Sequence, residues 1–132
     1  MKTAYPVIIT PGKEYQVVYI PDFDTGTEGK TIADAIEMAR DAIGELGLAY
    51  EDALKKPIPE PSSYFDVVKT AGKDAIVAFA DVDFDYYRKL SENRSVKKNC
   101  TIPAWLCAKA EEEGVNFSQV LQDALRERLR IN

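Results

Sequence analysis

Two groups of acidic residues have the types and spacing that metal-dependent cleavage of phosphodiesters could use. Each group has three members: Asp22, Asp24 and Glu28 in the first, and Asp81, Asp83 and Asp85 in the second. The second group alternates, so its members would share one face of a strand that continued past them. Carboxylates gathered on a sheet can hold two Mg²⁺ ions that activate water. Solvated strand ends and docking surfaces for cationic proteins also carry such carboxylates, and we expect these roles rather than catalysis.

The sequence contains no histidine among its 132 residues. This absence excludes a Ser-His-Asp triad, a Cys-His pair and an imidazole metal ligand. The two cysteines, Cys100 and Cys107, lack the further ligands that a metal site needs. We expect both to be small core residues rather than partners in a disulfide. We therefore predict that the protein is not an enzyme and uses no metal or other cofactor.

Alternating polar residues near position 100 have the chemistry of a DNA reader. The stretch 94–103 is predicted to be a strand in which Lys97, Asn99 and Thr101 share one face, while the opposite face is mostly apolar. No other strand follows, and a lone strand leaves its backbone donors and acceptors unpaired. A two-fold homodimer through residues 94–130, with two antiparallel copies of the strand, would satisfy them. Such a ribbon fits the DNA major groove, where lysine reads guanine and asparagine bonds adenine at two points.

Two helices are predicted after this strand. Pro103 suits the first helical position, and Gly114 is expected to end the first helix in a left-handed conformation. Asn116 is predicted to cap the second helix, with Gln119 three residues later as in a capping box. The second helix carries an apolar stripe, formed by Phe117, Val120, Leu121, Ala124, Leu125 and Leu129. The alternative is an ordinary helical hairpin with the polar strand on its surface, which leaves that strand unpaired.

Cations and amides near the ribbon are expected to contact DNA phosphates. The amide-rich helix start at Asn116 and Ser118 could hold a phosphate. Arg94, Lys98 and Arg88 would add an attraction that does not depend on base sequence and weakens with salt.

The first part of the chain is predicted to be a small antiparallel sheet with covering helices. Residues 5–10 and 15–20 are rich in β-branched residues and flank a Pro-Gly turn, which predicts a hairpin. Residues 25–29 are predicted to be a loop or a short third strand, and residues 74–84 a further strand. Residues 85–93 are predicted to be helical or a linker.

One main helix is predicted between these strands. Thr31 should cap it, with Asp34 near its positive end. Its buried stripe is predicted to consist of Ile32, Ile36, Ala39, Ile43 and Leu46. Gly47 is a predicted stop, and residues 50–55 a short second helix. The proline-rich residues 56–62 cannot continue a helix and are predicted to be an extended connector.

Charge divides the chain into an acidic body and a basic tail. Residues 1–87 hold 8 Lys and Arg against 16 Asp and Glu, a balance of -8, whereas residues 88–132 hold 9 against 6, a balance of +3. We therefore predict an α+β domain over 1–87 for a cationic partner, and a DNA-binding and dimerisation domain over 88–132. No apolar run approaches the length of a membrane span, and the start does not resemble a signal peptide, so we expect a cytoplasmic protein.

Both parts of the chain resemble HicB-type antitoxins of toxin–antitoxin systems. The tail resembles their ribbon-helix-helix domain at residues 99–103 (NCTIP) and 114–121 (GVNFSQVL). The body resembles their amino-terminal domain at residues 15–23 (YQVVYIPDF), 29–35 (GKTIADA) and 58–62 (IPEPS). The tail departs from the wider ribbon-helix-helix pattern in a first helix about one turn shorter than usual, and in Lys98 and Cys100 where apolar residues are common.

The resemblance implies a partial RNase H-like fold without nuclease activity for the body. It also implies that the body binds and neutralises a HicA-type toxin, a small mRNA-cleaving protein, and that the tail represses the chain's own operon as a homodimer or a higher oligomer. Asp22, Asp24 and Glu28 are then candidate toxin-binding residues. Two alternatives stay open at this point: a stand-alone ribbon-helix-helix regulator whose acidic domain binds a ligand or oligomerises, and a metal-dependent nuclease.

Overall fold

The computed structural model describes residues 2–93 and 95–131, which divide into two compact units. The first unit extends to Asn93, and the second comprises the residues that follow. The boundary predicted after residue 87 falls inside helix α3 (Phe84–Ser91), which packs against the first unit. Within the described residues, no helix combines the length and the apolar character that crossing a membrane requires.

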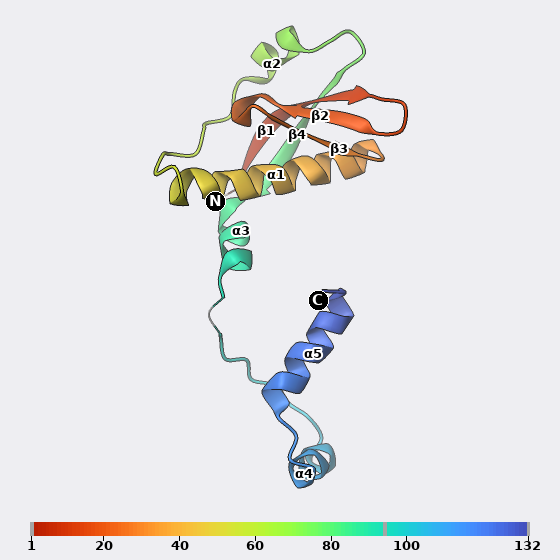
Figure 1. Cartoon of the computed structure of the whole chain (residues 1–132), viewed down its shortest axis with the longest axis vertical. Helices are drawn as coiled ribbons and strands as arrows, with labels where there is room; N and C mark the ends of the chain where they lie inside the picture. Colours follow the sequence, from red (N-terminus) through yellow and green to blue (C-terminus); the bar gives the residue numbers. More distant parts are fainter. Residues whose placement is uncertain (1, 94, 132) are drawn as a thin grey trace. The chain divides into compact units, whose positions relative to one another are not determined.

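The first unit is built on a four-stranded antiparallel sheet (Figure 1). Its strands are β1 (Lys2–Pro11), β2 (Gln16–Ile20), β3 (Thr25–Gly29) and β4 (Ile76–Asp83), in the order β3-β2-β1-β4. A short 3₁₀ turn, η1 (Pro21–Phe23), joins β2 to β3. The predicted small antiparallel sheet is confirmed, and residues 25–29 form the third strand rather than a loop.

Helix α1 (Ile32–Asp52) lies across one face of this sheet (Figure 1). Thr31 caps it as predicted, since its hydroxyl oxygen accepts a hydrogen bond from the Asp34 amide at 3.0 Å. The Asp34 carboxylate in turn accepts from the Lys30 amide at 2.8 Å. Ile32 is exposed, contrary to its predicted place in the buried stripe. The buried core between α1, η1 and the sheet consists of Tyr5, Val7, Ile9, Val18, Ile20, Phe23, Ala35, Ala39, Ile43, Ala80 and Val82.

The predicted stop at Gly47 is wrong, because α1 continues to Asp52 and includes the first half of the predicted second helix, residues 50–55. Glycine is required here by a close approach. A Cβ atom at Gly47 would lie 2.7 Å from Cδ1 of Phe84, and one at Gly44 would lie 2.5 Å from Cδ2 of Tyr87. Helix α3 can therefore press its aromatic rings against the α1 backbone only where α1 lacks side chains.

The proline-rich connector, residues 56–62, contains neither helix nor strand, as predicted. Two side chains, one from β1 and one from η1, hold it in place. The Tyr5 hydroxyl donates to the Pro59 carbonyl oxygen at 2.7 Å, and the Asp22 carboxylate accepts from both the amide and the hydroxyl of Ser62. A short helix that the sequence analysis missed, α2 (Tyr64–Thr70), then packs the buried Val67 toward β1 and β4.

The second unit contains helices α4 (Ala104–Glu112) and α5 (Phe117–Leu129). Gly114 has φ +67°, which confirms the predicted left-handed turn. Asn116 caps α5 as predicted, accepting from the Gln119 amide at 3.1 Å. In a capping box the Gln119 side chain would also bond back to the Asn116 backbone. Here it donates instead to the Asp123 carboxylate at 2.9 Å. Pro103 precedes the first helical position instead of occupying it, with an extended ψ of 142°.

None of the described residues of the second unit is buried. Phe117, Val120 and Leu125 on the apolar stripe of α5 are 44%, 54% and 50% exposed. Cys100 is exposed and Cys107 partly exposed, so the predicted core positions of the two thiols are wrong for a single copy. Residues 95–103 form no hydrogen-bonded strand within the described chain. The predicted ribbon needs a second copy as its partner and stays a prediction.

Candidate functional site

The three acidic residues predicted to bind a partner have different surroundings. Asp22 is half-buried and engaged with Ser62, so its carboxylate fixes the connector. Asp24 adopts a left-handed conformation with φ 44° and accepts a hydrogen bond from the Tyr19 hydroxyl at 2.6 Å. This hydrogen bond raises the pKa of Tyr19. Glu28 projects from β3 and is exposed.

The strand register brings Asp24 and Glu28 together with two apolar side chains. Val17 lies opposite Glu28, and Tyr19 lies opposite Gly26, so these residues share one face of the sheet. That face is turned away from α1, because the intervening Val18 is buried in the core. Val17 is 50% exposed and Tyr19 is 42% exposed. We call the group Val17, Tyr19, Asp24 and Glu28 the β2–β3 surface.

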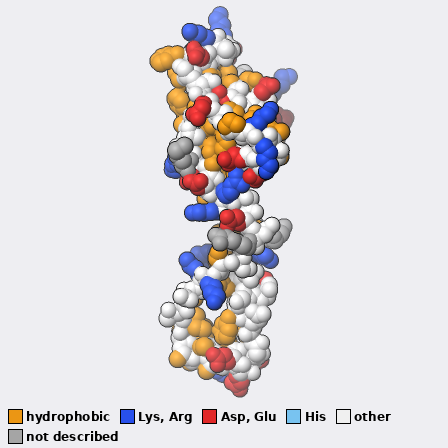
Figure 2. Space-filling view, turned by 90° about the vertical axis from the view of Figure 1, so that its left-hand side faces the viewer, with side chains coloured by type: hydrophobic (Ala, Val, Ile, Leu, Met, Phe, Trp, Pro, Cys, Tyr) orange, Lys and Arg blue, Asp and Glu red, His pale blue; other side chains and the backbone are white. Residues whose placement is uncertain are grey.

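Aromatic side chains extend this second face of the sheet toward β4. Phe79 lies opposite Pro6 in the register and stacks on Tyr64 of α2, with ring centroids 5.5 Å apart. Phe65 contacts Tyr64 edge-on at 5.7 Å and is largely exposed. Figure 2 shows hydrophobic and acidic side chains interspersed on the surface of the first unit. Large exposed apolar side chains of this kind are typical of a surface that binds another protein.

The second group of carboxylates does not gather on one face. Strand β4 ends at Asp83, whose side chain accepts from the Asp85 amide at 3.1 Å and opens α3. Asp81 instead pairs with Arg40 at 2.9 Å, and this hydrogen bond holds the pKa of the Asp81 carboxyl below its usual range. Among residues 2–93 and 95–131, no three acidic or cysteine side chains are placed to hold a metal ion. The geometry therefore gives the metal-dependent nuclease no support.

Arg88, predicted to add attraction for DNA, has a role inside the first unit. Its guanidinium pairs with Glu51 and Asp52 at the end of α1, each at 2.9 Å. The two carboxylates raise the pKa of Arg88 further. Together with the hydrogen bond from the Tyr87 hydroxyl to Asp41 at 2.6 Å, these pairs fasten α3 to α1.

The other predicted DNA-contacting residues belong to the second unit. Lys97, Lys98 and Asn99 line a hollow of about 600 Å³ together with Ser118 at the start of α5. Thr101 is exposed. Arg94 lies outside the described residues. The Asn116 side chain is engaged as the α5 cap, so any contact of Asn116 with phosphate would have to use its backbone.

A second hollow of this unit, of about 530 Å³, is mainly apolar. Ile102, Phe117, Val120 and Leu121 contribute to its walls, and both cysteines line it. The Cys107 thiol donates to the Glu111 carboxylate at 3.2 Å, which raises the thiol pKa. Figure 2 shows hydrophobic side chains of the second unit open to the surface. This hollow is a concave apolar face that lacks a covering element within the described chain.

Comparisons with known proteins agree with these observations. No protein-family model matches the chain. Over 65 residues the chain is 35% identical to antitoxin HicB of Escherichia coli strain K12, and this stretch is 47% of each protein. The chain therefore matches about half the length of that relative.

Two solved structures share the fold across nearly the whole chain. A chain of a toxin–antitoxin complex from Streptococcus pneumoniae matches with a TM-score of 0.54 and 25% identity, covering 97% of this chain and 99% of that one. The chain resembles HicB antitoxins in sequence and in fold. The crystal structure of antitoxin HicB from Burkholderia pseudomallei also shares the fold, with a TM-score of 0.50, 21% identity and 97% of each chain covered. The resemblance to HicB predicted from the sequence is thus confirmed.

Proposed function

We propose that this chain is a cytoplasmic antitoxin that binds and neutralises a HicA-like, mRNA-cleaving toxin and represses its own operon. The observation that carries the proposal is the likeness, over 97% of this chain, to a chain of a toxin–antitoxin complex. The 35% identity to antitoxin HicB over 65 residues supports it. Toxin binding is assigned to the first unit, which has a core of its own, and DNA binding to the second.

The β2–β3 surface is proposed as part of the toxin-docking surface. Its carboxylates, Asp24 and Glu28, complement a cationic partner and would speed association. Val17 and Tyr19 add apolar area that a partner can cover, and tyrosine is enriched at protein interfaces. Asp22 contributes indirectly, since it holds the connector through Ser62.

A charge-reversal variant tests this docking surface. The full chain is titrated into an RNA-cleavage assay of a HicA-like toxin, for which the product of the neighbouring gene is the first candidate. Glu28→Lys should require about tenfold more protein for half-inhibition, in line with the energy of close charge pairs at interfaces. Glu37→Lys is the matched control, because Glu37 is an exposed residue of α1, which covers the opposite face of the sheet. Equal inhibition by both variants would place the docking surface elsewhere.

The second unit is proposed to be a homodimer built as a ribbon-helix-helix domain. The absence of any buried residue among its described positions supports this, because a unit of this size needs a core. A second copy would pair residues 95–103 across the ribbon and cover the apolar hollow lined by Ile102 and Phe117. Sedimentation should therefore show a dimer, and dilution should unfold the second unit. A monomer whose tail stays folded on dilution would contradict the dimer.

Base reading is assigned to Lys97, Asn99 and Thr101, with Lys98, Ser118 and Arg94 directed to phosphates. Asn99→Ala should lose about 1–3 kcal/mol of discrimination between operator and random DNA. The control is Lys98→Ala, which should weaken binding to both DNAs alike and reduce its dependence on salt. DNA from upstream of the chain's own gene serves as operator. Equal weakening of both DNAs by Asn99→Ala would show that Asn99 does not read bases.

A further inference from the structure

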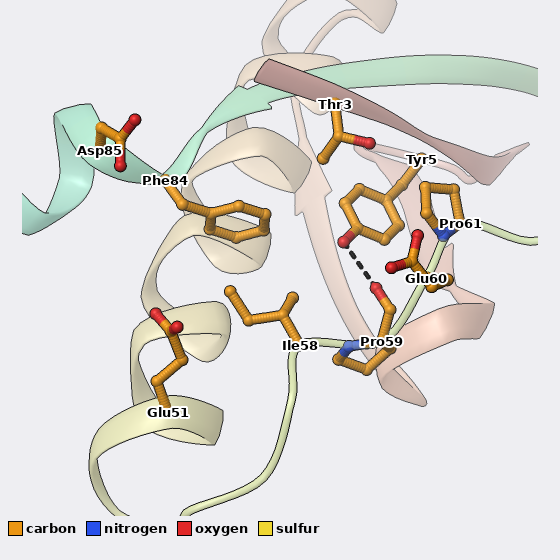
Figure 3. A pocket seen from close by; sticks show the side chains of 9 residues that line it. All are labelled: Thr3, Tyr5, Glu51, Ile58, Pro59, Glu60, Pro61, Phe84 and Asp85. Carbon is orange, nitrogen blue, oxygen red and sulfur yellow. Dashed lines mark hydrogen bonds between the residues drawn. The ribbon is translucent and has the colours of Figure 1, made fainter. Parts of the chain in front are cut away.

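The first unit contains a cavity of about 220 Å³ that lies outside the β2–β3 surface (Figure 3). It lies where the start of β1, the end of α1, the connector and the start of α3 meet. The Tyr5 hydroxyl is directed to the Pro59 carbonyl oxygen at 2.7 Å, so the connector forms one wall. Because this hydrogen bond and the Asp22–Ser62 contacts fix the connector, the cavity is built into the fold.

Two aromatic rings and three carboxylates face this cavity. Tyr5 and Phe84 stand nearly perpendicular, with centroids 6.3 Å apart and an interplanar angle of 80°. Figure 3 shows Glu60 beside Tyr5, with Glu51 and Asp85 on the other side of Phe84. None of the described residues that line the cavity is a lysine or an arginine. Burial raises the pKa of Tyr5 to about 12, and the charges of Asp22 and Glu60 add to this effect.

The chemistry of the walls selects a monovalent organic cation. Carboxylates pair with ammonium and guanidinium groups, and aromatic rings within about 6 Å attract the same groups. The cavity is smaller than the roughly 300–1,000 Å³ of typical small-molecule sites, which fits the end of one side chain better than a free ligand. Arginine and lysine also carry an apolar stem, for which Ile58 and Phe84 provide contacts. A divalent metal is disfavoured because the carboxylates lie on opposite sides.

We propose that this cavity receives one arginine or lysine side chain of the basic protein that the first unit binds, with Glu60 as its ionic partner. The inference rests on the proposed toxin binding and adds a defined contact to it. Glu51 is already paired with Arg88 at 2.9 Å, and Asp85 also has a partner. Glu60 is exposed on the connector and forms no ion pair within the described residues. An entering cation would therefore find its uncompensated charge at Glu60.

Calorimetric titration of the full chain with the protein encoded beside it tests this contact. Glu60→Gln removes the charge while keeping the shape, and Glu37→Gln removes one charge far from the cavity. Glu60→Gln should raise Kd about tenfold, the scale of a charge pair removed from an interface, while Glu37→Gln should stay within about twofold. Both variants change the net charge equally, so the difference between them isolates the local contact.

Replacing each arginine and lysine of the partner by alanine, in combination with Glu60→Gln, then identifies the entering side chain. One replacement should be non-additive with Glu60→Gln. The inference is overturned if the wild-type chain binds but Glu60→Gln behaves like Glu37→Gln, or if every combination is additive. Failure of the wild-type chain to bind at all would be a different result, since it refutes the proposed function and removes the basis of the inference with it.

Discussion

Replacing Gly47 by alanine should destabilise the first unit, although helix propensity alone predicts the reverse. In the interior of a helix, alanine is favoured over glycine by about 1 kcal/mol. At Gly47, however, the added Cβ would lie 2.7 Å from Cδ1 of Phe84 and closer still to Cε1, whereas ordinary contact begins at 3.4 Å. The ring cannot retreat freely, because Phe84 packs against the core and meets Tyr5 edge-on. Overpacking of this kind costs about 1–3 kcal/mol, so we expect a net loss of about 1 kcal/mol.

Urea denaturation of the full chain measures this loss, and the aromatic residues separate the two units. All 7 tyrosines precede residue 94, whereas the single tryptophan is Trp105. Near-ultraviolet circular dichroism of tyrosine therefore follows the first unit, and tryptophan fluorescence the second. The midpoint of the tyrosine signal should fall by about 0.3–1 M urea, while the midpoint of the tryptophan signal should not change.

Gly72→Ala is the matched control, because a Cβ there meets nothing within 4 Å. It should be neutral or slightly stabilising. A raised midpoint for Gly47→Ala would refute the packing of α3 on α1.

Two further predictions concern hydrogen bonds that organise the two units. Tyr5→Phe removes the hydrogen bond to Pro59, and its effect on stability should depend on pH. The pKa of Tyr5 is about 12 in the folded chain, against an ordinary value of 10.0. The protonated hydroxyl therefore stabilises the fold fully below pH 10, and this stabilisation is lost as the pH rises from 10 to 12. The stability difference between wild type and Tyr5→Phe in urea should shrink across that range, and a constant difference would contradict the assignment. Asn116→Ala removes the α5 cap and should lower the free energy of unfolding of the second unit, followed by tryptophan fluorescence, by about 1 kcal/mol. Asn116→Asp keeps a capping oxygen and should cost little. Equal midpoints for Asn116→Ala and the wild-type chain would argue against the cap.

The sequence correctly predicted those features that depend only on neighbouring residues in the chain. The Thr31 and Asn116 caps and the Gly114 turn depend on residues within a few positions, and each is confirmed. Runs rich in β-branched residues around a Pro-Gly turn likewise predicted β1 and β2. Gly47 was misread because its role depends on Phe84, which lies on another helix. Helix α2 was missed because its 7 residues are too few to show a clear helical period of apolar side chains.

The sequence predicted which kinds of residue form the candidate site, but not how their side chains are arranged. The acidic character of the body is visible in the sequence, yet the roles of single carboxylates depend on distant partners. Asp22 accepts hydrogen bonds from Ser62, which lies 40 residues later, and Asp81 accepts one from Arg40 of α1. The cavity beside Glu60 is formed by four separate segments, so no single sequence motif predicts it. Alternation marked Lys97, Asn99 and Thr101 as one face of a predicted strand, whereas residues 95–103 form no strand in the single copy that the structure describes.

The most direct test of the proposed function is an RNA-cleavage titration with this purified chain and a HicA-like toxin, for which the product of the neighbouring gene is the first candidate. If the chain is an antitoxin, cleavage should fall linearly as the chain is added and stop when the toxin sites are filled. The same mixture should elute as one complex in size-exclusion chromatography. If cleavage continues unchanged at a large excess of folded chain, and the two proteins elute apart, the toxin-neutralising role is wrong.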